Sequence, residues 1–146
     1  MRNTIVIALI SLVFIGCGKD KFTTVPQLKY ESVNTTVLDA GQIIQFKLSF
    51  TDAEGDVDSL FIKKITPRCA ATIFKDERSL PADFKITNGK EGELLVSYGH
   101  RVSNYPAIGD PLCAFNDTCT FRFVLKDKEK NLSDTMYSET IVIIKQ

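Results

Sequence analysis

The stretch Gln42-Ile43-Ile44-Gln45-Phe46-Lys47-Leu48-Ser49-Phe50 decides the fold of this chain. Its apolar side chains at Ile44, Phe46, Leu48 and Phe50 alternate with polar ones. Successive side chains of a β-strand point to opposite faces, so this period of two places one face on an apolar core and the other in water. We therefore predict a half-buried strand over residues 42–50.

The same alternation recurs on both sides of this stretch. It predicts strands over residues 28–32, 57–65, 83–86, 93–98 and 118–126, a short continuation at 37–38, and a last strand region over 133–145. Residues 69–81 are less regular, and no stretch shows a sustained helical period. Short strands at this spacing, without helical crossovers, predict an all-β domain with antiparallel pairing, a sandwich or a barrel.

The first twenty residues are of a different kind. A charged start at residues 1–3 precedes an apolar run over 4–15 and then Gly16-Cys17, which are the parts of a secretory signal peptide. The run is shorter than the ~20 residues of a transmembrane span. A simple cleaved signal is the other alternative, but Phe14 and Ile15 are large where its cleavage site has small residues.

The sequence Phe14-Ile15-Gly16-Cys17 resembles the lipobox of bacterial lipoproteins, in which the cysteine is lipidated and begins the mature protein. The resemblance implies a signal peptide at residues 1–16, lipidated Cys17 with a tether over 17–27, and one domain over 28–146. It places the protein in the cell envelope, anchored to the membrane by its N-terminal lipid. Because no Asp follows Cys17 directly, the outer membrane, on its periplasmic or surface face, is favoured over the inner.

Composition limits the partners of the mature chain. The whole chain carries 18 basic and 18 acidic side chains, and only Arg2 is lost with the signal peptide. No basic patch or stripe stands out, so the sequence gives no indication of nucleic-acid binding. Without the signal peptide 130 residues remain, which is enough for one domain.

Two further motifs carry a resemblance to a fold family. They are Phe50-Thr-Asp-Ala-Glu-Gly-Asp56 and Phe121-Arg-Phe-Val-Leu-Lys-Asp127, the second followed by Asn131 and Ser133. With them the chain resembles the immunoglobulin-like or fibronectin-III-like modules of Gram-negative lipoproteins. The resemblance implies an antiparallel immunoglobulin-like β-sandwich of about seven strands, and it implies fold far more than function.

Three cysteines remain once Cys17 carries lipid. Disulfides persist in an exported compartment, and an odd number leaves one thiol free. In the immunoglobulin-like topology Cys69 lies at the same end as Cys113 and Cys119, so we expect a Cys69–Cys113 disulfide and an inward-facing Cys119. Cys113–Cys119 is the alternative pair. Zinc is disfavoured because the spacing is wrong and the single histidine is distant from the cysteines.

An acidic turn follows the strand over residues 42–50, and the immunoglobulin-like topology brings the turn before the last strand to the same end. Calcium prefers six to eight hard oxygen ligands. The candidate ligands are Asp52, Glu54, Asp56, Asp58 and Asp127. Lys63 stands where an EF-hand loop would need its glutamate, so this is not an EF-hand. The alternative is a solvated turn around Gly55.

Residues 99–117 form the longest connection, and they show no periodicity. Such loops are often functional, and His100, Arg101, Tyr105 and Phe115 make this one a candidate binding loop. The alternative is a crossover immobilised by proline and a disulfide. We expect His100 to lie at the surface, and Lys63-Lys64 to be a solvated face.

These features predict a lipid-anchored, non-enzymatic module that binds or scaffolds an envelope protein or a glycan. A calcium-dependent glycan- or polymer-binding accessory lipoprotein is the second hypothesis. An enzyme comes third, because the chain has one histidine, no nucleophile motif and no phosphate-binding loop. No cofactor other than calcium is expected.

Overall fold

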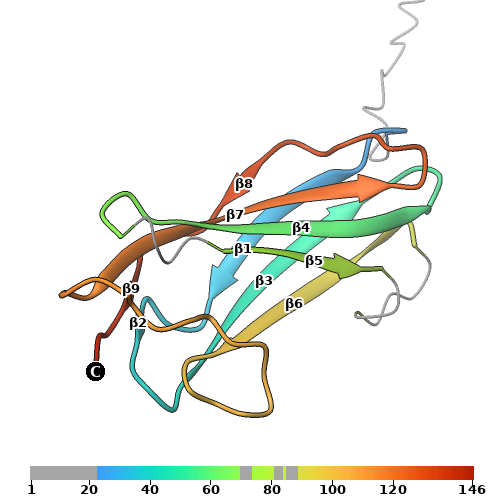
Figure 1. The fold of residues 1–146 in the computed structure, drawn as a ribbon. Coiled ribbons are helices and arrows are strands. Elements are labelled where there is room, and N and C mark those ends of the chain that lie inside the picture. The colour runs from blue at the N-terminus through green and yellow to red at the C-terminus, as the bar shows by residue number, and fades with distance from the viewer. Residues whose placement is uncertain (1–22, 70–73, 81–83, 85–88) are drawn as a thin grey trace, which may run out of the picture.

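The computed structural model describes residues 23–69, 74–80, 84 and 89–146 (Figure 1). The expected lipidation residue Cys17 and the signal segment 1–16 lie outside these residues, as does the strand expected over 83–86 apart from Phe84. Within the described part of the chain, every regular element is a strand, and no helix has the length and apolar character needed to cross a membrane. For the described residues, the prediction of an all-β domain is confirmed.

Nine strands occur among the described residues. They are β1 (Gln27–Val33), β2 (Val37–Leu38), β3 (Ile43–Thr51), β4 (Val57–Ile65), β5 (Lys75–Ser79), β6 (Glu91–Gly99), β7 (Asp117–Asp127), β8 (Met136–Tyr137) and β9 (Ile141–Ile143). The strands predicted at β1, β2, β3, β4, β6 and β7 are confirmed to within two residues at each end. The last strand region divides into β8 and β9.

The strands form two sheets. The first has the order β1-β3-β6, and the second has the order β2-β9-β7-β4-β5, with β8 paired to β7. Every pairing is antiparallel except that of β2 with β9, which is parallel. The stretch that decides the fold, β3, is the centre of the first sheet.

Apolar side chains from the two sheets meet in one core. Ile44, Phe46 and Leu48 of β3 are fully buried. The ring of Phe46 lies 4.6 Å from that of Phe121 and 5.3 Å from that of Phe123, both on β7. Full burial of such a side chain is worth ~1.5–3 kcal/mol relative to exposure, so these alternating faces hold the two sheets together.

The antiparallel register gives the domain two distinct ends. Gln27 pairs with Thr51, and Val57 pairs with Asp127, so residues 23–27, 52–56 and 127–131 share one end, the tether end. Residues 99–117 connect the other ends of β6 and β7 and make up the loop end. Figure 1 shows residues 23–27 and the loop end on opposite sides of the domain.

Candidate functional site

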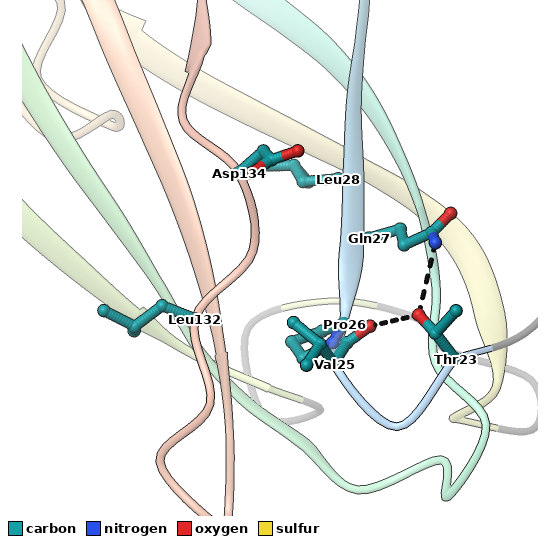
Figure 2. A pocket seen from close by; sticks show the side chains of 7 residues that line it. All are labelled: Thr23, Val25, Pro26, Gln27, Leu28, Leu132 and Asp134. Carbon is teal, nitrogen blue, oxygen red and sulfur yellow. Dashed lines mark hydrogen bonds between the residues drawn. The ribbon is translucent and has the colours of Figure 1, made fainter.

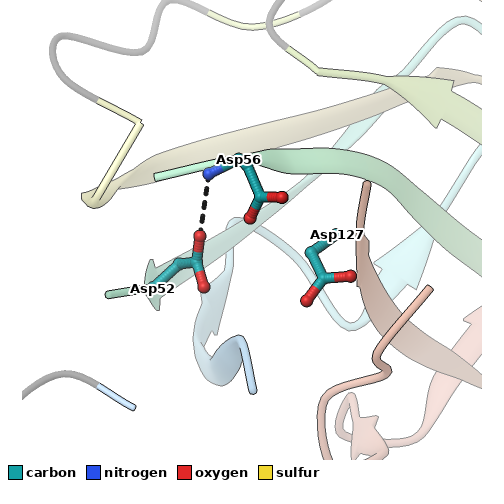
Figure 3. A group of neighbouring side chains, drawn as sticks. All are labelled: Asp52, Asp56 and Asp127. Carbon is teal, nitrogen blue, oxygen red and sulfur yellow. Dashed lines mark hydrogen bonds between the residues drawn. The ribbon is translucent and has the colours of Figure 1, made fainter. Parts of the chain in front are cut away.

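Three carboxylates converge at the tether end. Asp52 follows β3, Asp56 precedes β4, and Asp127 is the last residue of β7. One carboxylate oxygen from each of them lies within 4.8 Å of the others (Figure 3). The antiparallel pairing of Val57 with Asp127 brings these segments together. We call these three residues the acidic triad.

Local hydrogen bonds fix the triad. The backbone N–H of Asp56 donates to Oδ2 of Asp52 over 2.9 Å. The backbone N–H and side-chain amide of Asn131 donate to the two oxygens of Asp127, both over 2.8 Å. Gly55 adopts a φ of 74°, which lets the chain turn between the first two aspartates.

Two oxygens of the triad have no hydrogen-bond partner among the described residues. They are Oδ1 of Asp52 and Oδ1 of Asp56, and both atoms are buried. The Asp52 and Asp127 side chains lie inside the protein, with residue exposures of 0% and 1%. Burial raises the pKa of Asp52, because removing a carboxylate from water disfavours its charged form.

The other two acidic residues expected to contribute lie outside the triad. Glu54 is exposed. Asp58 accepts a hydrogen bond from Ser59 over 2.8 Å and pairs with Lys126 over 3.1 Å, and these two contacts hold its pKa below the usual range. The structure therefore brings together three of the five predicted ligands.

The single histidine is buried at the loop end, so the prediction that His100 lies at the surface is wrong. It is 1% exposed, and its Nε2 donates to Oδ1 of Asp110 over 3.0 Å. Arg101 binds the same carboxylate through Nε and Nη2. His100 therefore shapes the loop from within and presents no side chain to a partner.

The loop end presents apolar side chains to solvent. Tyr105, Leu112 and Phe115 are 40%, 70% and 42% exposed. The guanidinium of Arg68 lies 5.0 Å from the ring centre of Phe115. Leu112 was not identified from the sequence as a candidate binding residue. Its one signal there is that it is an apolar residue directly after a proline in this loop.

A disulfide joins the loop end to the end of β4. The structure pairs Cys69 with Cys113, the pair expected from the sequence, with their Cα atoms 5.8 Å apart. The ammonium of Lys145 donates to the backbone oxygen of Cys113. Cys119 is a buried free thiol, and burial raises its pKa to about 12.

A buried ion pair lies near this disulfide, since the backbone N–H of Cys69 donates to the hydroxyl of Thr66, which contacts the pair. Nζ of Lys64 is 3.0 Å from Oδ2 of Asp117, and both side chains are fully buried. Thr66 donates its hydroxyl to the other oxygen of Asp117. The expectation that Lys64 is solvated is wrong. Its position two residues after the buried Ile62 was the signal for an inward side chain.

A pocket of about 340 Å³ lies beside the tether end (Figure 2). The segment from Thr23 to Leu28 forms one wall, and Leu132 and Asp134 form the other. Gln27 donates its amide to the hydroxyl of Thr23, which donates in turn to the backbone oxygen of Val25. Among the described residues that line this pocket, Asp134 is the one that carries a charge.

Comparison of the sequence with models of protein families and with curated proteins found no match.

Proposed function

We propose that this chain is a lipid-anchored, non-enzymatic module of the bacterial cell envelope that holds a recognition surface away from its membrane. One observation carries the proposal. The exposed apolar side chains of the loop end lie at the opposite end of the domain from the segment that leads to the lipobox (Figure 1). Function at the envelope rests on the lipobox resemblance of residues 14–17.

The order of the strands supports an immunoglobulin-like sandwich. In that fold strands A, B and E share one sheet and strands G, F and C share the other. Here β1-β3-β6 corresponds to A-B-E, and β9-β7-β4 corresponds to G-F-C. Folds of this class host many functions, so the recognition role rests on the loop end and not on the fold.

The tether limits how far the domain lies from the lipid. Nine residues lie between Cys17 and Gln27, the first residue of β1, so the two are at most ~36 Å apart when the chain is fully extended. The tether end therefore stays close to the membrane, and the loop end is free to face away from it.

The loop end is suited to recognition because it is held in shape before a partner arrives. The Cys69–Cys113 disulfide and the contacts of Asp110 with His100 and Arg101 restrain it. A pre-ordered surface loses less conformational entropy on binding. Aromatic and arginine side chains are enriched at interfaces, so an envelope protein or a glycan is the expected partner.

A calcium-dependent glycan- or polymer-binding role is the second candidate, favoured by the acidic triad. The triad lies at the tether end, however, and two of its three residues are buried. A ligand held at the loop end would not reach an ion bound there. We therefore place recognition at the loop end.

Fractionation tests the anchoring. We expect the wild-type protein in the membrane fraction. The Cys17→Ser variant should not be cleaved after residue 16 and should incorporate no acyl label. A Cys17→Ser chain that is cleaved at the same bond and stays with the membrane would contradict the lipobox assignment.

Photo-cross-linking in the native envelope tests the surface. A photoreactive phenylalanine analogue is placed at Tyr105 or, as the matched control, at Tyr137, which is 55% exposed on β8. We expect a discrete adduct from position 105 and none from position 137. The same adducts from both positions, or none from either, would contradict the recognition surface.

A further inference from the structure

We propose that the acidic triad of Asp52, Asp56 and Asp127 binds one calcium ion, which holds the β3–β4 turn against the β7–β8 turn. This inference is independent of the recognition role of the loop end. The ion is structural, because its protein ligands lie at the tether end and largely inside the domain.

The first support is the state of the oxygens. Asp52 has an exposure of 0%, and no described residue donates a hydrogen bond to its Oδ1. Oδ1 of Asp56 is also buried and without such a donor. Figure 3 shows the three carboxylates turned toward a common space. Folded proteins rarely leave buried polar atoms unpaired, so a ligand between these oxygens is the simplest account.

The second support is the charge. Among the described residues no lysine, arginine or histidine forms a salt bridge with any member of the triad, although Lys126 nearby pairs with Asp58. Three carboxylates this close repel one another, and burial strengthens the repulsion. A divalent cation at their centre replaces that repulsion with attraction.

Size and donor chemistry select calcium. Calcium–oxygen distances of ~2.3–2.6 Å place ligands on opposite sides of the ion up to ~5.2 Å apart, which accommodates separations within 4.8 Å. A magnesium octahedron allows only ~4.2 Å and usually takes one or two carboxylates. Zinc prefers nitrogen and sulfur, which the triad lacks. Water and backbone oxygens complete the calcium shell.

The ion also reaches the tether through hydrogen bonds. The backbone N–H of Ala53, next to Asp52, donates to the oxygen of Thr23 over 3.0 Å. The N–H of Asp52 itself donates to the oxygen of Lys90 over 2.7 Å. A fixed β3–β4 turn therefore holds the last part of the tether against the domain. Calcium is expected to protect this junction from proteolysis.

Calorimetry and thermal melts of the mature chain in detergent test the site, after removal of bound metal with chelator. We expect one calcium per chain and a melting temperature that rises with calcium concentration, since a ligand of the native state alone stabilises it. Magnesium chloride should give at least tenfold weaker binding. Absence of binding heat together with superimposable melts in calcium and in chelator would overturn the proposal.

Two variants locate the ion. Asp56→Asn, at a half-buried position, should weaken calcium binding at least tenfold while melting in chelator no lower than wild type, because it relieves repulsion. Asp58→Asn is the matched control and should leave the affinity unchanged. Calcium binding that Asp56→Asn does not weaken, or that both variants weaken equally, would place the ion elsewhere and overturn the triad.

Discussion

Replacing Lys64 by methionine should destabilise the domain severely. The ammonium lies 3.0 Å from the Asp117 carboxylate, and neither side chain contacts water. At that distance an effective dielectric of 20 gives an attraction of ~5–6 kcal/mol, which the desolvation of both charges largely offsets. Methionine keeps much of the lysine volume but removes the ammonium that pairs with the buried Asp117 carboxylate. We expect a loss of ~3–5 kcal/mol in the free energy of unfolding.

Urea unfolding followed by circular dichroism measures this loss, and a double-mutant cycle assigns it to the pair. Asp117→Asn alone should also be costly, whereas Lys64→Met with Asp117→Asn should recover most of the stability, because no buried charge remains and Thr66 keeps an acceptor. Lys63→Met, on the adjacent and half-buried position, is the control and should cost less than ~1 kcal/mol. A Lys64→Met chain within ~1 kcal/mol of wild type would refute the reasoning.

The remaining predictions concern the cysteines and the turn glycines. Replacing Cys69 and Cys113 together by serine should cost ~4 kcal/mol in the chain-entropy model for a separation of 44 residues, measured by urea unfolding, whereas loss of the shorter Cys113–Cys119 loop would cost only ~2 kcal/mol. Burial raises the pKa of Cys119 to about 12, so at pH 8 its thiol should stay protonated. It should resist iodoacetamide in the native chain and react only in denaturant. Rapid labelling of the native chain, detected by mass spectrometry, would contradict its burial. Gly89→Ala should destabilise the domain by more than ~2 kcal/mol, because the new Cβ would lie 2.3 Å from the backbone oxygen of Gly55. Gly41→Ala is the control and should cost only ~1 kcal/mol, because φ is also positive there but nothing lies within 4 Å of the new Cβ. Equal melting temperatures for the two variants would exclude the clash.

The sequence predicted the strands whose alternation is strong. In β3 and β7 large apolar residues occupy successive alternate positions, so the pattern alone shows which face of each strand is buried, whereas in β4 the inward face also carries Ser59 and Lys64. β5 was missed because its five residues, Lys75–Ser79, are all polar. It exists because β4 offers it a ladder of hydrogen bonds, which is a tertiary cause.

The candidate site was predictable only in part. A turn rich in aspartate pointed to the tether end, and the topology brought Asp127 to it. Which aspartates converge depends on local partners, since Lys126 draws Asp58 away and Glu54 extends into solvent. The prediction that His100 lies at the surface failed because the Asp110 carboxylate accepts a hydrogen bond from its Nε2 inside the loop, although its buried Nδ1 has no partner among the described residues.

The position of the tether at one end of β1 and of the loop at the other has a mechanical consequence. If the chain is anchored and bound as we propose, a pull between the lipid and a partner at the loop end would run along the strands. The hydrogen bonds between β1 and β3, from Gln27–Thr51 to Val33–Phe46, lie across that direction. They would bear the force together in shear instead of opening one after another like a zipper. The proposed module would therefore resist unfolding when it is pulled from its two ends.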